Sequence, residues 1–150
     1  MLQIVRTHGR SPEILGLIEL LDADLVSRYG PIQAEFDPHN KVDKVETAVV
    51  ALWDRHPVGC GCFRPLPEST VEIKRMYVRP EHRGKGIAVA IMQELEAWAI
   101  ELGTRTAVLE TGLAQPEAIA LYRKMGYTQI ENYPPYVDVA ISMCMGKRLD

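Results

Sequence analysis

The sequence predicts a mixed α/β sheet, and three observations support this fold class. Three strand-like segments follow one another with short turns over residues 46–78. Helix-like segments then alternate with further strands from residue 87 onward. The 150 residues suit a single domain, and no repeat, low-complexity tract or linker interrupts them. The expected order of elements is β-α-(α)-β-β-β-α-β-α-β-β, in one domain of residues 1–150.

The first elements are a strand and a helix. The segment LQIVR, residues 2–6, alternates weakly between apolar and polar residues and predicts a strand. Ser11 and Pro12 are typical of a helix start, as N-cap and first-turn residue. Apolar residues then recur at helical spacing up to Gly30. Residues 31–45 are polar and interrupted by prolines, which predicts a loop that holds at most one short helix.

The central segments predict an antiparallel meander, because short turns join them. Its strands cover residues 46–54, 57–66 and 70–78. The later elements follow from helical spacing, buried apolar runs and glycine stops. They are a helix over 87–102, a strand over 106–111, a helix over 116–125, and strands over 127–131 and 139–149 around the loop 132–138.

Composition and charge exclude several classes of protein. Hydrophobic residues make up 47% of the chain and charged residues 25%, as in a soluble globular protein. The formal net charge of −3 argues against a general binder of nucleic acid or anionic membranes. Neither a signal peptide nor an apolar run long enough to span a bilayer is recognisable, so we expect a cytoplasmic protein with reduced thiols.

The cysteines do not predict a metal site. Cys60 and Cys62, with His56 nearby, suggest a pair of metal ligands at first sight. A zinc site needs a second pair of ligands, which the sequence lacks. We therefore expect no metal, and interpret Cys60 and Cys62 as alternate positions on one face of a strand.

A glycine-rich segment stands between the strand over 70–78 and the following helix. Glycine is a poor helix former, yet Gly84 and Gly86 alternate here with Arg83 and Lys85. Free backbone amides, the helix dipole and two cationic side chains together favour an anion such as a diphosphate. A glycine-rich turn with solvated charges is the alternative interpretation. The spacing matches neither a P-loop nor a dinucleotide-binding motif.

At this segment the sequence resembles the GNAT superfamily of N-acetyltransferases, which use acetyl-CoA. The family signature Q/R-x-x-G-x-G/A is matched by Arg83, Gly86 and Ala88. The preceding strand ends in the aromatic-valine pair Tyr77-Val78, as is usual in the family. A second signature, the later helix with ALYRKMGY after the strand AVLET, occurs in the expected order. The resemblance covers nearly the whole chain and implies the acyl-CoA N-acyltransferase fold.

The resemblance implies acetyl-CoA as co-substrate, and it indicates which residues contact it. Backbone amides of the glycine-rich segment would hold the diphosphate, and the pantetheine arm would pair with the preceding strand beside a bulge. Gln115 stands where the family often has an asparagine that contacts pantetheine. The implied coenzyme-binding residues are Met76, Tyr77, Val78, Arg83, Gly84, Lys85, Gly86, Ile87, Ala88, Gln115 and Tyr122.

The resemblance also implies two catalytic residues. Tyr122, within ALYRKMGY, matches the tyrosine near the sulfur of CoA and would donate a proton to the departing thiolate. Its alternative role is that of a core tyrosine. Glu72 matches the register of a glutamate base in some protein-acetylating members. In a regular strand without a bulge it would share its face with Lys74, Met76 and Val78. An ion pair with a nearby Arg or Lys is the alternative for Glu72, and a water chain is the alternative base.

The family builds its acceptor pocket from the first helix region and the loop between the last two strands. Candidate wall residues here are Tyr29, Phe36, Tyr133 and Tyr136. Candidates for attracting a cation are Asp37, Glu131 and Asp138. Each of these residues has a solvated or packing role as its alternative. The expected partner is a small-molecule or peptide amine, with no nucleic-acid or membrane partner, and a homodimer is common in the family.

The preferred hypothesis is thus an N-acetyltransferase that transfers acetyl from acetyl-CoA to a primary amine by direct attack in a ternary complex. A non-catalytic module that senses acyl-CoA is the alternative, since it would share the same coenzyme site. A nucleotide-binding regulator fits less well, because the phosphate-binding motifs differ. The fold and the coenzyme site do not determine the acceptor.

Overall fold

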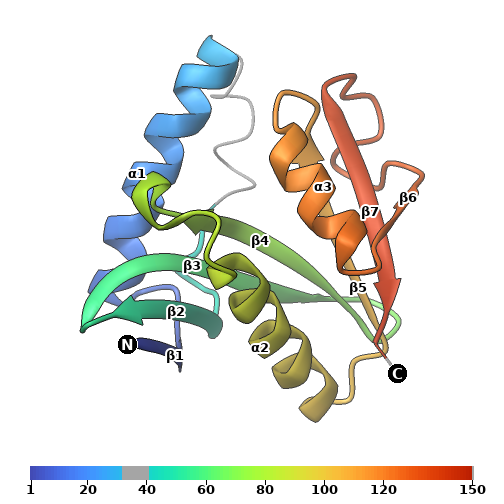
Figure 1. Cartoon of the computed structure of the whole chain (residues 1–150). Coiled ribbons are helices and arrows are strands. Elements are labelled where there is room, and N and C mark those ends of the chain that lie inside the picture. The colour runs from blue at the N-terminus through green and yellow to red at the C-terminus, as the bar shows by residue number, and fades with distance from the viewer. Residues whose placement is uncertain (32–40, 150) are drawn as a thin grey trace.

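Seven strands join into one mixed sheet in the computed structural model, which describes residues 1–31 and 41–149. The strands lie in the order β1-β2-β3-β4-β5-β7-β6 (Figure 1). They are β1 (Leu2–Thr7), β2 (Thr47–Trp53), β3 (His56–Leu66), β4 (Thr70–Val78), β5 (Thr106–Gly112), β6 (Thr128–Ile130) and β7 (Ser142–Arg148). Within the described chain, β4 and β5 form the one parallel pair, and the other neighbours are antiparallel. The predicted mixed α/β class is confirmed.

Helices cover both faces of this sheet. The described part of the chain holds the α-helices α1 (Pro12–Tyr29), α2 (Ile87–Glu101) and α3 (Pro116–Lys124). The start of α1 is as predicted, because the Ser11 hydroxyl accepts a hydrogen bond from the backbone N–H of Ile14 at 3.4 Å. None of the helices in the described residues is long and apolar enough to cross a bilayer.

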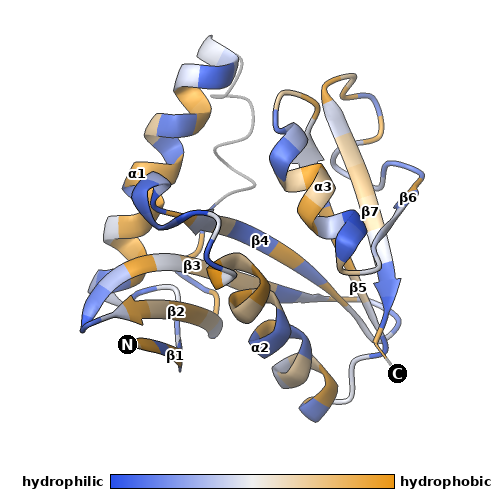
Figure 2. Ribbon diagram, viewed as in Figure 1, coloured by the Kyte–Doolittle hydropathy of each residue, from blue (hydrophilic) through white to orange (hydrophobic). Residues whose placement is uncertain are grey.

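Two apolar clusters hold the helices on the sheet. On one face, Ile91 and Leu95 of α2 are fully buried against β2 to β5. On the other face, Ile14 and Leu17 of α1 are 2% and 1% exposed. Burial of each such side chain contributes about 1.5–3 kcal/mol. The chain is apolar along these contacts and hydrophilic in the segment between β4 and α2 (Figure 2).

Three local features differ from the prediction. β7 begins at Ser142 instead of residue 139, because the preceding residues form a turn in which the Ser142 N–H donates to the Val139 carbonyl at 3.1 Å. β6 covers only Thr128–Ile130. A 3-10 helix, Pro80–His82, follows β4 and was not predicted. These differences leave the order of the elements unchanged.

Candidate active site

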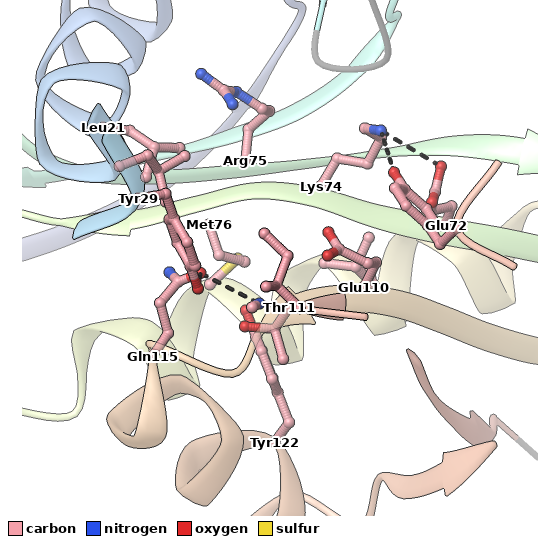
Figure 3. Close-up of a pocket in the computed structure, with 15 residues that line it drawn as sticks. Leu21, Tyr29, Glu72, Lys74, Arg75, Met76, Glu110, Thr111, Gln115 and Tyr122 are labelled. Atoms are coloured by element: carbon pink, nitrogen blue, oxygen red, sulfur yellow. Dashed lines mark hydrogen bonds and ion pairs between the residues drawn. The ribbon is translucent and has the colours of Figure 1, made fainter. Parts of the chain in front are cut away.

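A cleft opens where β4 and β5 separate. The two strands pair in parallel over residues 70–73 of β4 and 106–109 of β5. Within the described residues they do not pair beyond this point, although β4 continues to Val78 and β5 to Gly112. Each strand therefore presents an unpaired backbone edge to the gap. The cleft is lined by Leu21, Leu25, Tyr29, Glu72, Ile73, Lys74, Arg75, Met76, Glu110, Thr111, Gly112, Gln115, Tyr122, Tyr136 and Ile141 (Figure 3).

A β-bulge in β4 lies beside the cleft. Between the pairs Cys60–Tyr77 and Cys62–Lys74, β4 has two residues and β3 has one. Arg75, one of the two, has a φ of 60°, which is unfavourable for an arginine. Backbone strain of this kind is typical of functional sites. The bulge that the family resemblance implied in this strand is thus present.

The bulge divides the side chains of β4 between the two faces of the sheet. Met76 and Val78 pack into the apolar cluster under α2. Glu72 and Lys74 point to the other face, beside each other (Figure 3). The shared face expected for a regular strand is therefore wrong for Met76 and Val78, because the extra residue reverses the alternation.

Free backbone amides gather between β4 and α2. Gly84 and Gly86 both have a φ of 78°, a conformation that favours glycine. A Cβ at either glycine would meet nothing within 4 Å, so the segment borders open space. Among the described residues, the amides of residues 84–88 have no hydrogen-bond acceptor. Because they open α2, these amides present the positive end of the helix dipole.

The two cationic side chains of this segment lie on aromatic rings. Nε of Arg83 donates to the Val78 carbonyl at 2.8 Å, and the guanidinium lies 5.6 Å from the centre of the Tyr77 ring. Nζ of Lys85 lies 5.0 Å from the centre of the Trp53 ring. Both cations are exposed and add positive charge near the free amides.

Glu72 is buried, with 1% of its surface exposed, and both carboxylate oxygens have partners. Oε1 accepts a hydrogen bond from Nε of Arg64 at 2.7 Å and lies 3.6 Å from Nζ of Lys74. Oε2 accepts a hydrogen bond from the Tyr133 hydroxyl at 2.8 Å. The ion pair that was the alternative for Glu72 is therefore present, and its role as a base stays a prediction.

A second carboxylate in the cleft, Glu110 of β5, was not among the predicted site residues. Its Oε2 accepts a 2.6 Å hydrogen bond from the Ser142 hydroxyl. Its Oε1 has no donor in the described part of the chain. Burial raises the pKa of Glu110, and the opposing effects of Ser142 and Lys74 are smaller. The signal for this residue was a charge inside the apolar strand AVLET.

Two buried cations beside the bulge, Lys74 and Arg75, were likewise not among the predicted site residues. Nζ of Lys74 lies 3.6 Å from Glu72 Oε1 and 3.4 Å from the Tyr136 hydroxyl, and both distances are long for a hydrogen bond. Burial lowers the pKa of Lys74. Arg75 is paired with Asp22 of α1, while its Nε is buried without a partner among the described residues. Charged residues in a strand that is otherwise buried were again the available signal.

Tyr122 of α3 and Gln115 at its N-cap line the cleft, as two predicted site residues. Tyr122 is 7% exposed, and burial raises the pKa of its phenol. Its ring packs edge-on against Tyr127, with centroids 6.1 Å apart. Oε1 of Gln115 accepts hydrogen bonds from the Gly112 amide at 3.3 Å and the Tyr29 hydroxyl at 3.4 Å. Tyr29, a predicted wall residue, is thereby fixed at the cleft.

Two further wall tyrosines come from the β6–β7 loop. The rings of Tyr133 and Tyr136 meet edge-on, with centroids 5.6 Å apart. Tyr136 lines the cleft directly, whereas Tyr133 is connected to it through its hydrogen bond with Glu72. The loop therefore closes the cleft on the side of Glu72.

The other four predicted residues are Glu131, Asp138, Phe36 and Asp37. Glu131 and Asp138 are exposed and do not line it. Phe36 and Asp37 lie outside the described residues.

Cys60 and Cys62 support the bulge from the neighbouring strand. Their thiols contact the carbonyl oxygens of Arg75 and Lys74 at 3.5 and 3.4 Å. Burial raises the pKa of each thiol to about 12, so both stay protonated donors. As expected, they are alternate residues on one face, in the cluster under α1.

Comparison with known proteins identifies a family, a relative in sequence and similar solved structures. The model of the Acetyltransferase (GNAT) family matches residues 15–127. The IAA acetyltransferase of Azospirillum brasilense is 38% identical over 149 residues, 97% of either chain. A candidate acyl-CoA N-acyltransferase of Klebsiella pneumoniae has a TM-score of 0.83 and 30% identity, over 100% of this chain and 99% of the other. The PaiA N-acetyltransferase of Thermoplasma acidophilum, solved with coenzyme A, shares the fold (TM-score 0.76, 15% identity, 99% of both chains).

Proposed function

The chain belongs to the GNAT family of acetyltransferases, and from this premise we propose that it transfers acetyl from acetyl-CoA to a primary amine by direct attack in a ternary complex. One observation carries the proposal: the free amides of residues 84–88 follow the strand whose edge is unpaired in the cleft. A diphosphate and an extended arm attached to it need these two features side by side. The coenzyme A complex of Thermoplasma PaiA supports the choice of co-substrate.

In this proposal, backbone groups of the protein bind coenzyme A. The amides of residues 84–88 hold the diphosphate, and Arg83 and Lys85 add positive charge nearby. The pantetheine arm pairs with the free edge of β4 around residues 76–78. The side-chain amide nitrogen of Gln115 is available for a further hydrogen bond, because the described contacts of this side chain use its oxygen.

The chemical step requires little from the protein beyond positioning and proton transfer. The thioester is already activated, so direct attack by a neutral amine needs no covalent enzyme intermediate. A backbone N–H of the bulge stabilises the oxyanion that forms. Tyr122 keeps its proton near neutral pH because burial raises its pKa, and it donates that proton to the departing thiolate. Glu72 is the predicted base.

An assay with acetyl-CoA and a panel of amines tests the proposal. Release of free thiol and a mass increase of one acetyl group on the same amine are the expected results. Tight binding of acetyl-CoA without thiol release from any amine would instead favour the non-catalytic sensing module.

A further inference from the structure

We propose that the acceptor is a small zwitterion of the α-amino-acid type, with its amine against Glu110 and its carboxylate against Lys74 and Arg75. This inference rests on the function proposed above and names the class of its acceptor. It follows from the hydrogen bonds that the described residues of the cleft leave unmade, and from where those groups lie in the sheet.

The amine end is set by Glu110. Its Oε1 has no donor in the described structure, whereas both oxygens of Glu72 are occupied. An ammonium or amine group can therefore bond to Glu110 without displacing a side chain. Glu110 also lies close enough to Tyr122 to raise the pKa of that phenol. An amine held at Glu110 is thus on the side of the cleft where the thioester sulfur is expected.

The carboxylate end is set by two buried cations. Nζ of Lys74 lies 3.4 Å from the Tyr136 hydroxyl and 3.6 Å from Glu72 Oε1, and both distances exceed that of a good hydrogen bond. Nε of Arg75 is buried and has no partner among the described residues. A buried N–H left without an acceptor is destabilising, and more so when the group is charged. A carboxylate in the cleft would offer these cations an acceptor, which a simple alkylamine does not.

The sheet holds the two ends at neighbouring positions. Ile73 and Leu109 are the last paired residues of β4 and β5, so Lys74 and Glu110 each stand one residue beyond the split. Opposite charges on adjacent strands suit a ligand in which the ammonium and carboxylate groups are attached to the same carbon atom, as in an α-amino acid. Leu21 and Leu25 of α1 line the same cleft and offer an apolar wall to its side chain.

The test compares acceptors that differ in one group. L-Leucine, L-leucinamide and 3-methylbutylamine share a side chain, but only leucine has a carboxylate. The amide has the least basic amine of the three, so without carboxylate recognition it should react at least as well as leucine. We expect kcat/KM for leucine to exceed that of both analogues by about tenfold or more. L-Phenylalanine with its amide and 2-phenylethylamine gives a second set.

Two variants locate the effect. Lys74→Met removes the charge and keeps the length of the side chain, and it should lower kcat/KM for leucine about tenfold more than that for leucinamide. Lys124→Met, at an exposed lysine late in α3, is the matched control and should change neither. Affinity for acetyl-CoA and thermal unfolding report on folding, and Arg75→Lys replaces Lys74→Met if that variant does not fold.

The outcomes separate the two proposals. Equal kcat/KM for leucine and leucinamide, and for phenylalanine and its amide, would overturn the zwitterion assignment and leave the acetyltransferase function standing. If protein that binds acetyl-CoA acetylates none of the six compounds or any other amine, the proposed function fails and the acceptor assignment fails with it.

Discussion

Two carboxylates face the cleft, and their hydrogen bonds suit them to different tasks. Glu72 is held on both oxygens, by Arg64 and Tyr133, and its role as the base stays a prediction. Glu110 is held on one oxygen by Ser142, which leaves Oε1 for a ligand. Burial raises the pKa of Glu110 and thereby makes it more basic than an ordinary glutamate.

The raised pKa of Glu110 predicts how the stability of the folded protein changes with pH. Its folded pKa is raised above the ordinary value of 4.5, so the folded state loses stability as pH rises through the folded pKa. In Glu110→Gln the side chain does not titrate, and its carbonyl still accepts the Ser142 hydrogen bond. The unfolding temperature of the variant minus that of the original protein should therefore be larger at about pH 8 than at about pH 4. A difference in unfolding temperature that is the same at both pH values would contradict this.

Tyr122 is predicted to act through its proton. Tyr122→Phe keeps the ring against Tyr127 and removes the hydroxyl, so packing should change little. We expect kcat to fall by about 10²-fold or more while KM for acetyl-CoA stays unchanged, as for loss of a general acid. Steady-state kinetics with a saturating amine measures both. An unchanged kcat would return Tyr122 to the role of a core tyrosine.

At the residue level, the sequence could indicate those site residues that belong to a motif shared by the family. Gln115 and Tyr122 were found that way and do line the cleft. Lys74 and Glu110 were not among the predicted site residues, because the family resemblance assigned neither of them a role. Lys74 and Glu110 stand at neighbouring positions because of the register between two strands that are far apart in the sequence. The local sequence pattern does not encode this register.

Among the elements, the segment between β4 and α2 combines two uncommon properties. It begins a helix with residues that are poor helix formers, and it leaves successive amides without acceptors among the described residues. Gly84 and Gly86 adopt a positive φ, which turns the chain so that these amides border open space. The turn and the start of the helix were predictable because glycine spacing and helix start are both local signals, and the binding of a diphosphate here stays a prediction.

A matched pair of glycines tests what this segment does. Gly86 and Gly103 stand at the two ends of α2, with φ of 78° and 87°, and a Cβ at either would meet nothing within 4 Å. Each Gly→Ala change should therefore destabilise the fold by a similar amount, about 1–2 kcal/mol. Only Gly86→Ala should weaken binding of coenzyme A, about tenfold, because its Cβ would enter the space of the diphosphate. Calorimetric titration measures this; equal affinities would show that the segment does not bind coenzyme A.

The bulge in β4 changes which side chains share a face, and local sequence patterns did not predict this change. A regular strand would place Met76 on the same face as Glu72, and the structure places it on the opposite face. The extra residue fits because Arg75 accepts a strained φ and forms an ion pair with Asp22 of α1. Strain that is compensated by a contact from another element leaves no trace in local propensity.

For the whole molecule, the split between β4 and β5 determines where chemistry can occur. The strand meander and the later alternation of helices and strands predicted the fold class from local signals. The sheet order and the parallel pairing of β4 with β5 depend on long-range contacts. The resemblance to a family supplied that long-range information, and the acceptor side, which varies within a fold, was predicted least well.

A crystal structure of the protein with coenzyme A tests the central claim most directly. The account predicts diphosphate oxygens within hydrogen-bond distance of the amides of residues 84–88, and the pantetheine arm beside residues 76–78 of β4. Coenzyme A bound outside the cleft, or a diphosphate that leaves those amides untouched, would contradict it.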